Sequence, residues 1–206
     1  MNFLIQPITE KYLDEALQLH TDVFFNNEPL TPRLNISKNE FKKIIGKQLL
    51  SSIRNGYSIG AFNNNELIGF IICSDMNDSS KDQTLSLNSK NPFEKLHLAI
   101  EKLNIVLKQE PFINKKLFHI ETMGVDKSYV GYGIGKELIK KALQIAQDNN
   151  FDYIYAECTN IFSENGMLNN GFEIVHQYAW KDCGIKEFEN LAGNFSLTVK
   201  NIFWKN

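Results

Sequence analysis

Cysteines and long apolar runs are both scarce in this sequence. The three cysteines, Cys73, Cys158 and Cys183, form no CxxC pair. An odd number of separated thiols suits free cysteines in a reducing compartment better than a disulfide framework or a structural zinc site. Nowhere do about 18 apolar residues follow one another, which is the length that a membrane-spanning helix needs. Neither a metal nor a membrane is therefore expected as a partner.

A strong excess of either charge is missing too. The formal net charge is -2 and the isoelectric point is about 6.1, with Lys and Arg spread along the chain. Proteins dedicated to nucleic acids usually carry a basic stripe, so no nucleic-acid partner is expected. The opening stretch MNFLIQPITEKYLDEAL has no basic head followed by an apolar run, so no secretory signal is expected either. We expect a cytoplasmic protein that is a monomer.

Alternating and helical patterns succeed each other along the 206 residues, and a chain of this length fits a single domain, 1–206. Strands are expected at 2–8, 57–63, 66–74, 116–125, 153–158, 172–180 and 195–204, and helices at 9–25, from about 37 to 56, at about 92–109, at 134–149 and at 162–170. This alternation predicts an α/β fold, in which helices cover both faces of a mixed sheet of about seven strands with antiparallel edges.

Local signals refine these elements. Thr9 is a candidate N-cap for the first helix, whereas SKNE, at the start of the second, is read as having no carboxylate at the capping-box position. Asn63 to Asn65 tolerate left-handed backbone and predict the turn of a hairpin. Residues 75–91 are polar and without pattern, so we expect a flexible surface excursion there.

The stretch VDKSYVGYGIGKELIKKAL places Gly131, Gly133 and Gly135 directly before a helical pattern. A strand, a glycine-rich turn and a helix bring several backbone N–H groups to the positive end of a helix dipole, where an anion such as phosphate can bind. The P-loop pattern fails at Val130 and Glu137, and the dinucleotide pattern GxGxxG fails at the last glycine in both registers. A tight strand-to-helix turn without a ligand remains the alternative interpretation.

A third pattern, [QR]xxGx[GA], fits Gly133 and Gly135, with Val130 in place of Gln or Arg. The preceding strand HIETMGV and the later stretch TNIFSENGMLNNGF, which is similar to NxxAxxLYxxxGF, complete a resemblance to the GCN5-related N-acetyltransferase (GNAT) superfamily over roughly residues 117–180. In the second motif Asn160 and the closing Gly-Phe pair match, and Ser163 replaces Ala.

This resemblance implies a GNAT-type fold, acetyl-CoA as co-substrate and no metal. It assigns the pyrophosphate to backbone amides of the glycine turn, and the pantetheine arm to the strand before it. Asn160 and Ser163 follow from the second motif. The implied cofactor-binding residues are Met123, Gly124, Val125, Val130, Gly131, Tyr132, Gly133, Ile134, Gly135, Lys136, Asn160 and Ser163.

Two further stretches resemble the insect-type arylalkylamine N-acetyltransferases. FFNNEPLTPRLN is similar to their DEPL segment, which implies that Glu28 is the general base. CTNIFSENGMLNNGF is similar to their serine pair, which maps to Thr159 and Ser163. Met167 stands where many superfamily members have a proton-donating Tyr. Glu28 could instead be one acidic residue on a surface turn, and Thr159 and Ser163 could simply cap the helix that comes after them.

The predicted function is therefore direct transfer of acetyl from acetyl-CoA to a small primary amine, with an arylalkylamine as the leading acceptor. A polyamine or protein amine is an alternative, although no carboxylate cluster that would suit a polyamine is evident in the sequence. A non-catalytic acyl-CoA sensor is another, because Met167 and Val130 depart from the superfamily pattern. Phe24, Phe25 and Tyr178 could line an aromatic pocket or the core. The histidines at 20, 97, 119 and 176 have no metal-like spacing and are expected to be structural.

Overall fold

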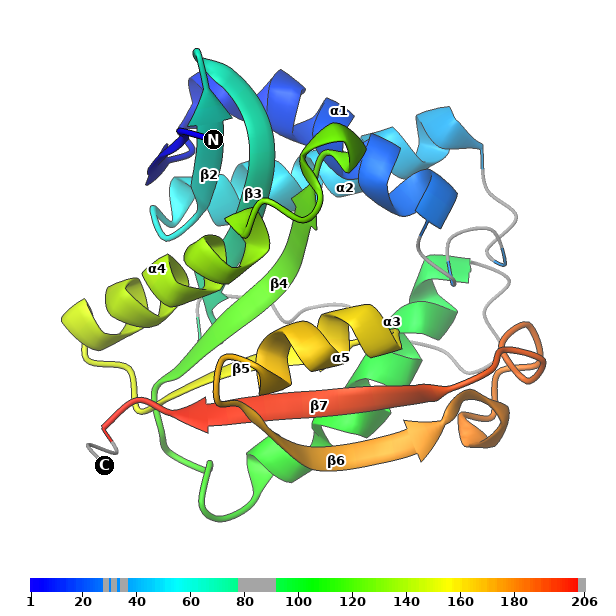
Figure 1. The fold of residues 1–206 in the computed structure, drawn as a ribbon. Helices are drawn as coiled ribbons and strands as arrows, with labels where there is room; N and C mark the ends of the chain where they lie inside the picture. Colours follow the sequence, from blue (N-terminus) through cyan, green and yellow to red (C-terminus); the bar gives the residue numbers. More distant parts are fainter. Residues whose placement is uncertain (28–29, 31–32, 34–36, 78–91, 204–206) are drawn as a thin grey trace.

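The computed structural model describes residues 1–27, 30, 33, 37–77 and 92–203. Its centre is a seven-stranded sheet in the order β1-β2-β3-β4-β5-β7-β6 (Figure 1). In chain order the strands are β1 (Leu4–Pro7), β2 (Ile59–Asn63), β3 (Glu66–Asp75), β4 (Leu117–Val125), β5 (Tyr153–Cys158), β6 (Glu173–Ala179) and β7 (Asn194–Asn201). Only β4 and β5 pair in parallel, so the predicted mixed sheet with antiparallel edges is confirmed.

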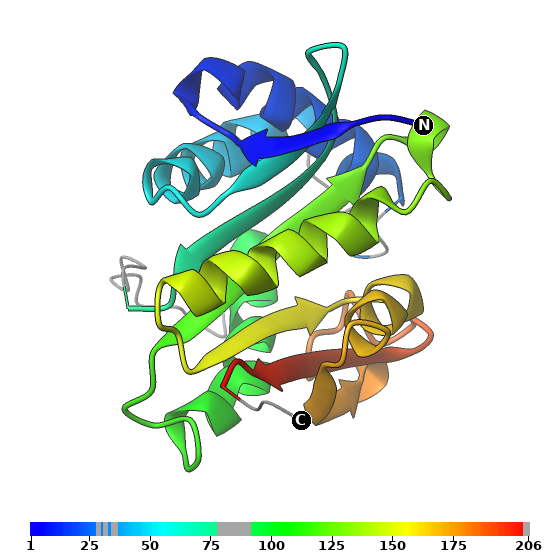
Figure 2. The ribbon, with the colours of Figure 1, turned by 60° about the vertical axis from the view of Figure 1, so that its left-hand side comes forward.

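Helices cover both faces of the sheet, as the sequence predicts. The main helices are α1 (Leu13–Asn27), α2 (Lys38–Arg54), α3 (Pro92–Leu103), α4 (Ile134–Asp148) and α5 (Ile161–Leu168). Figures 1 and 2 show α4 and α5 on one face and α1, α2 and α3 on the other. We call the side of the sheet that carries α1, α2 and α3 the α1–α3 face.

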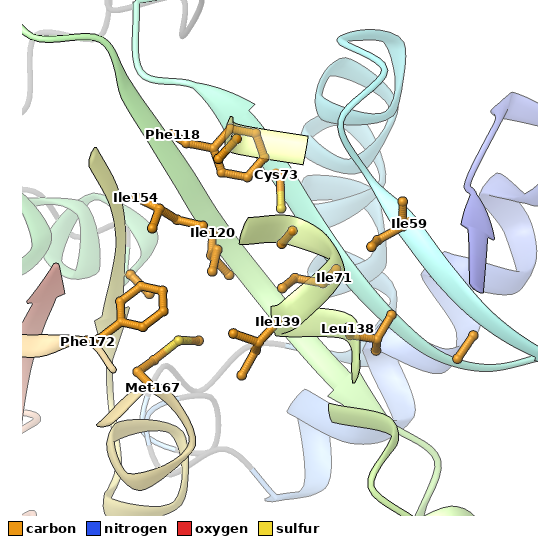
Figure 3. Close-up of a cluster of buried hydrophobic side chains, with 14 of the residues drawn as sticks. Ile59, Ile71, Cys73, Phe118, Ile120, Leu138, Ile139, Ile154, Met167 and Phe172 are labelled. Atoms are coloured by element: carbon orange, nitrogen blue, oxygen red, sulfur yellow. The ribbon is translucent and has the colours of Figure 1, made fainter. Parts of the chain in front are cut away.

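The core explains why β3 is almost continuously apolar. Burial on both sides removes the polar positions that a half-exposed strand would show. Ile71 and Cys73 of β3 pack with Leu138 of α4, whereas Phe70 and Ile72 point into a cluster with α1 and α2. Figure 3 shows the first of these clusters, in which side chains of β2, β3, β4 and β5 meet those of α4 and α5.

Local sequence signals agree with the structure only in part. The hairpin between β2 and β3 is confirmed, with Asn64 and Asn65 at φ values of 47° and 70°. The interpretation of SKNE was wrong, because Ser37 and Glu40 form a complete capping box: Glu40 is the third residue after the cap, where its carboxylate reaches the Ser37 amide. Thr9 makes no side-chain cap hydrogen bond and leads into a short 3-10 segment, η1 (Glu10–Tyr12), ahead of α1.

The sheet opens between β4 and β5. Their parallel pairing runs only from Leu117 opposite Tyr153 to Ile120 opposite Ala156. Beyond it the two strands separate, and β4 continues alone alongside β3 (Figure 1). A β-bulge marks this place: Ile72 pairs with Thr122 and Cys73 with Ile120, so Glu121 has no residue opposite it in β3. We call this opening the β4–β5 split.

Two expectations from composition can also be compared with the structure. All three cysteines are free and buried. Within the described ranges, no helix combines the length and apolar character required to cross a membrane. The predicted surface excursion at 75–91 lies largely outside the described residues, which include only 75–77 of it. Asp75 is the last residue of β3.

Candidate functional site

The glycine turn between β4 and α4 has the geometry of an anion site. Gly131 and Gly133 adopt φ values of 91° and 80°, which residues other than glycine rarely adopt. A Cβ atom built on either residue meets nothing within 4 Å, so the turn faces open space. Gly133 is the N-cap residue of α4, and no side chain caps this helix start among the described residues. Unsatisfied N–H groups at the positive end of a helix therefore remain available to an anion.

The other residues around this turn divide into exposed and buried ones. Val130 and Tyr132 are 68% and 58% exposed, and Lys136 is exposed on the first turn of α4. Ile134 instead points into the core at 1% exposure. A Cβ on Gly135 would lie 3.4 Å from Cε of Met123, which brings the helix start close to β4. The surface of the turn is therefore formed by backbone amides, by glycines and by the exposed side chains of Val130 and Tyr132.

The last residues of β4 present a free backbone edge. Met123, Gly124 and Val125 pair with β3 on one side. On the other side, within the described part of the chain, the pairing with β5 has ended at Ile120. An extended ligand with amide groups can add to such an edge as a further strand would. A short 3-10 segment, η4 (Lys127–Tyr129), connects this free edge to the glycine turn, and Met123 of β4 contacts the start of α4 at Gly135, so the structure brings two of the sequence-predicted binding segments together.

The start of α5 lies at the end of β5, on the other strand of the split. Asn160 caps α5, accepting hydrogen bonds from the amides of Phe162 and Ser163, each at 3.0 Å. The hydroxyl of Ser163 donates to the carbonyl oxygen of Asn160 at 2.8 Å. Thr159 Oγ1 is 3.5 Å from the Asn160 side-chain amide. Asn160 is therefore the cap in place of the two hydroxyl residues considered for that role, and both Thr159 and Ser163 contact it.

Met167 and Cys158 behave as core residues beside this helix start. Met167 is 2% exposed, within the cluster drawn in Figure 3. Cys158 is buried, and burial raises its pKa to about 11 against the weaker opposing effect of nearby hydroxyls of Thr198 and Ser163. Its thiol is therefore neutral near pH 7 and is not a prepared nucleophile.

A buried ion pair bridges β4 and β5 where they begin to separate. His119 Nε2 lies 2.6 Å from Glu157 Oε2, and the side-chain amide of Asn104 donates to the other Glu157 oxygen at 2.5 Å. Burial alone lowers the pKa of His119, but the Glu157 carboxylate more than reverses this and the net pKa is raised. Burial raises the pKa of Glu157, but His119 and Asn104 lower it by more than burial raises it, so the net pKa lies below the usual value of a glutamate. Both shifts favour the ionised pair.

The bulged residue Glu121 brings a second carboxylate to the same face. Its two oxygens lie 2.9 and 2.8 Å from the hydroxyl of Ser52 in α2. Among the described residues no Lys, Arg or His forms an ion pair with it. Glu121 is half-buried, so a carboxylate without a cationic partner lies beside the split.

α1 contributes a neutral histidine next to these residues. Burial lowers the pKa of His20 to about 3, and its ring stacks on Phe24 with centroids 4.4 Å apart. Nε2 of His20 lies 3.2 Å from the hydroxyl of Thr122. α1 is thereby held against the unpaired segment of β4.

The remaining sequence-predicted residues have different outcomes. Glu28, the predicted base, lies outside the described residues. Tyr178 belongs to the core, where its hydroxyl donates to the carbonyl of Ala99 at 2.6 Å. Phe25 packs edge-on against Phe41. Among the histidines that were expected to be structural, His119 forms the ion pair with Glu157.

Sequence reasoning missed His119, Glu121 and Glu157. One signal was available, because HIETMGV carries His119 and Glu121 two residues apart, on either side of the buried Ile120. Polar side chains at alternate strand positions point to one face. Glu157, on a different strand, could be linked to them only through the sheet register.

A sequence model of the acetyltransferase (GNAT) family matches residues 13–164, more than half of the chain. The chain belongs to the GNAT family. The matched region contains both strands of the split, the glycine turn and the start of α5. An acyltransferase follows from this membership, and acetyl-CoA is the donor that the family uses.

Three solved structures illustrate the similarity of this GNAT protein to known folds. Arylalkylamine N-acetyltransferase 2 from Aedes aegypti has a TM-score of 0.83 at 21% identity, covering 98% of this chain and 100% of that one. An agmatine N-acetyltransferase has a TM-score of 0.81 at 12% identity, covering 98% and 100%. A polyamine N-acetyltransferase of Drosophila melanogaster, which forms N-acetylagmatine, has a TM-score of 0.80 at 12% identity, covering 97% and 100%. At these identities the similarity concerns the fold.

Proposed function

We propose that this protein is an acetyl-CoA-dependent N-acetyltransferase that acts on a small primary amine by direct transfer in a ternary complex. The observation that carries the proposal is the continuity of the free β4 edge with the uncapped start of α4. Together they offer strand amides for a pantetheine arm and helix-terminal amides for a pyrophosphate. The residues proposed to bind the cofactor are those that the sequence predicts.

The chemistry needs few groups. The neutral amine nitrogen attacks the thioester carbonyl, a C–N bond forms and the C–S bond breaks, while one amine proton goes to a base and the thiolate leaves. Amides of β4 near Met123 and Val125 are proposed to stabilise the oxyanion. Glu28 is proposed as the base, and Ser163 with Thr159 is proposed to assist thiolate departure.

The place of Ser163 supports this last assignment in one respect. Its hydroxyl lies at the start of α5, next to the end of β5 and near the thiol of Cys158. In the structure that hydroxyl donates to Asn160, so it has to change acceptor in order to donate to a thiolate. Thr159 is the less direct candidate because its hydroxyl contacts only the capping side chain.

The sequence and the structure both bear on the class of amine that accepts the acetyl group. The resemblance in the sequence favours an arylalkylamine, and the stacked rings of His20 and Phe24 beside β4 are compatible with an aromatic guest. Structures named for arylalkylamine, agmatine and polyamine acetylation fit this fold almost equally well. The fold therefore leaves the acceptor class to the side chains at the split.

Thiol release from acetyl-CoA in the presence of tyramine, dopamine, serotonin and spermidine tests the activity. We expect release with at least one of these amines, and calorimetric binding of CoA to the free protein. Binding without release across a broad panel of amines would instead support the acyl-CoA sensor. Absence of CoA binding would reject both hypotheses.

The proposed base has its own test. Glu28→Ala should lower kcat/KM for the amine by about tenfold or more at pH 7, because the ammonium must lose a proton before attack. A value within twofold of the unmodified protein removes the assignment. Glu66→Gln, at the start of β3, is a suitable control because Glu66 is exposed and lies beyond the end of the β3–β4 pairing, which begins at Gly69.

A further inference from the structure

Among the described residues, the α1–α3 face at the split carries more carboxylates than cations. Burial raises the pKa of the Tyr155 hydroxyl, and the carboxylates of Glu157, Glu121 and Asp75 raise it further, to well above its usual value. Three carboxylates thus act on one ring. Within the described ranges no Lys or Arg affects Tyr155, His119 or Glu157. The cation present there is His119, and it is already paired with Glu157.

Glu121 forms no ion pair among the described residues, although its charge adds to that of Glu157 in raising the pKa of His119. Its described partner is one hydroxyl, that of Ser52, which also lies 3.1 Å from the carbonyl oxygen of Gln48. A single hydroxyl proton cannot serve both acceptors fully. A half-buried carboxylate with one shared neutral donor favours a cation beside it.

Unpartnered buried polar atoms on the same face form an independent observation. Ser74 is 3% exposed, and its hydroxyl has no hydrogen-bond partner among the described residues. It is the direct cross-strand neighbour of His119, so its side chain lies on the same face of the sheet. The side-chain oxygen of Asn104, whose amide group donates to Glu157, likewise lacks a partner. His20 Nδ1, on the helix that contacts Thr122, is a third such atom.

All three atoms can accept a hydrogen bond. The Asn104 oxygen can only accept, the Ser74 hydroxyl can accept or donate, and Nδ1 of His20 accepts when Nε2 carries the proton. Buried polar atoms in proteins are normally satisfied, and leaving them unpaired is costly. A guest that brings several N–H donors would meet this need, whereas an aromatic ring brings none.

A metal ion does not fit the arrangement. Metal ligands must converge on a point, and no group of three or more His, Cys, Asp and Glu side chains does so in the part of the chain that the structure describes. The polar groups instead extend from Glu121 in the bulge, past Ser74 and His119, to Asn104 in η3 (Asn104–Lys108). Such an extended arrangement suits an organic cation better than a metal ion.

The charge of this guest is separate from that of the reacting amine. The amine that attacks the thioester must first lose its proton, so a negative field cannot hold it by charge in its reactive form. We propose that the preferred acceptor carries a second cationic group, an ammonium or guanidinium at the far end of a short chain, which lies against Glu121 and the Glu157–His119 pair. This inference rests on the proposed acetyltransferase function and ranks diamines above arylalkylamines as acceptors.

Matched amines test the inference. 1,4-Diaminobutane and n-butylamine share length and reacting group but differ in the distal charge, and 4-aminobutylguanidine replaces the distal ammonium by a guanidinium. We expect kcat/KM for both dications to exceed that for n-butylamine by at least about tenfold, the effect of one charge-assisted hydrogen bond. Tyramine should fall below the dications. A ratio near one, or tyramine as the best acceptor, would overturn the inference.

Variants connect the preference to the residues. In Glu121→Gln the ratio of kcat/KM for diamine to monoamine should fall at least about fivefold, whereas Glu66→Gln should leave the ratio unchanged. An unchanged ratio in Glu121→Gln, checked for folding by urea unfolding, contradicts the assignment. Should Glu121→Gln fail to fold, the salt dependence of the unmodified protein decides: KM for the diamine must rise with NaCl more steeply than KM for n-butylamine.

Calorimetry separates the failure of this inference from that of the proposed function. If no amine is acetylated, yet 1,4-diaminobutane binds the CoA-loaded protein more tightly than n-butylamine and loses this advantage in Glu121→Gln, the cation site stands and the enzyme assignment falls. If monoamines and diamines are acetylated equally well, the enzyme assignment stands and the cation site falls.

Discussion

The hydroxyl of Ser163 donates to the carbonyl oxygen of Asn160 at 2.8 Å, while the side chain of Asn160 accepts from the Ser163 amide at 3.0 Å. The two residues hold each other at the first turn of α5. The proposed role of Ser163 in thiolate departure therefore uses the same hydroxyl that donates to Asn160, whereas the cap itself uses the Ser163 amide. Variants of both residues are needed to separate them.

The helix cap and a catalytic role of Ser163 predict different effects of Asn160→Ala and Ser163→Ala on stability and on kcat. Asn160→Ala removes the acceptor for two helix amides and should lower the free energy of unfolding by about 1–2 kcal/mol. Ser163→Ala removes one hydrogen bond and should cost about 1 kcal/mol or less. If the Ser163 hydroxyl assists the leaving thiolate, kcat falls about tenfold in Ser163→Ala. An unchanged kcat, with the stability loss measured by urea unfolding, would leave only the cap.

Gly133 should be sensitive to a single methyl group. Gly133→Ala places a Cβ in open space but at a φ of 80°, so it should lower the free energy of unfolding by about 1 kcal/mol through backbone strain alone. Gly166 in α5 also faces open space, without a positive φ, and Gly166→Ala should instead stabilise by about 0.5–1 kcal/mol. Thermal unfolding of both variants gives the comparison, and equal signs would contradict the left-handed turn.

Weaker CoA binding is expected to accompany the strain at Gly133. The amides of the turn are aligned by the left-handed residues, so Gly133→Ala should also raise the dissociation constant of CoA in calorimetry. Gly166→Ala should not, since Gly166 lies on a different helix and a Cβ built there meets nothing within 4 Å. A dissociation constant unaffected by Gly133→Ala would argue against the pyrophosphate assignment.

The His119–Glu157 pair predicts a dependence on pH. The folded pKa of His119 is raised above 6.5, so its contribution to stability is complete below pH 6.5 and is lost as the pH rises through the folded value. The folded pKa of Glu157 lies below 4.5, so its contribution is present above pH 4.5 and is lost as the pH falls through the folded value. The pair should therefore stabilise the fold most between about pH 4.5 and pH 6.5.

Glu157→Gln tests this pair directly. It removes the carboxylate that holds the imidazolium, and the pKa of His119 measured by NMR titration should fall below 6.5, since burial then dominates. Breaking a buried pair should also lower the free energy of unfolding at pH 6 by about 3 kcal/mol. An unmoved titration of His119 would mean that the ion pair does not form in solution.

His20 should make the protein sensitive to acid. Its folded pKa is about 3 against 6.5 in the unfolded chain, so below pH 6.5 only the unfolded state takes up its proton. Stability then falls by up to about 1.4 kcal/mol for each pH unit from this residue. His20→Gln should flatten the dependence of the free energy of unfolding on pH between 6 and 4, measured by urea unfolding. Parallel curves for the two proteins would contradict a buried neutral imidazole.

Local patterns carried most of the fold. Alternation and helical spacing predicted each strand and the main helices to within a few residues, because their apolar faces are set by the sheet and by the helix repeat. α3 is the main exception, since the pattern runs to Gln109 but α3 ends at Leu103 and a 3-10 segment comes next. There Asn104 directs its amide to Glu157, a contact with a distant strand that no local pattern contains.

The two halves of the site differed in how far they could be predicted. Left-handed glycines before a helix are a local signal, so the turn at Gly131 and Gly133 could be located from the sequence. The acidic face could not, because only the parallel register of β4 and β5 brings Glu121 and Glu157 to the same end of the pairing. The bulge at Glu121 shifts the alternation of β4 by one residue, and periodicity alone does not reveal such a shift.

The strand order also constrains how this chain can be assembled. β1, β2, β3, β4 and β5 are neighbours in the sheet in the same order as in the sequence once the helices are set aside, so this part can form progressively during synthesis. β6 cannot join in the same way, because β7, the last of these strands in the chain, lies between β5 and β6. A ribosome-bound intermediate should therefore hold a finished five-stranded unit while β6 is without the strand that connects it to β5.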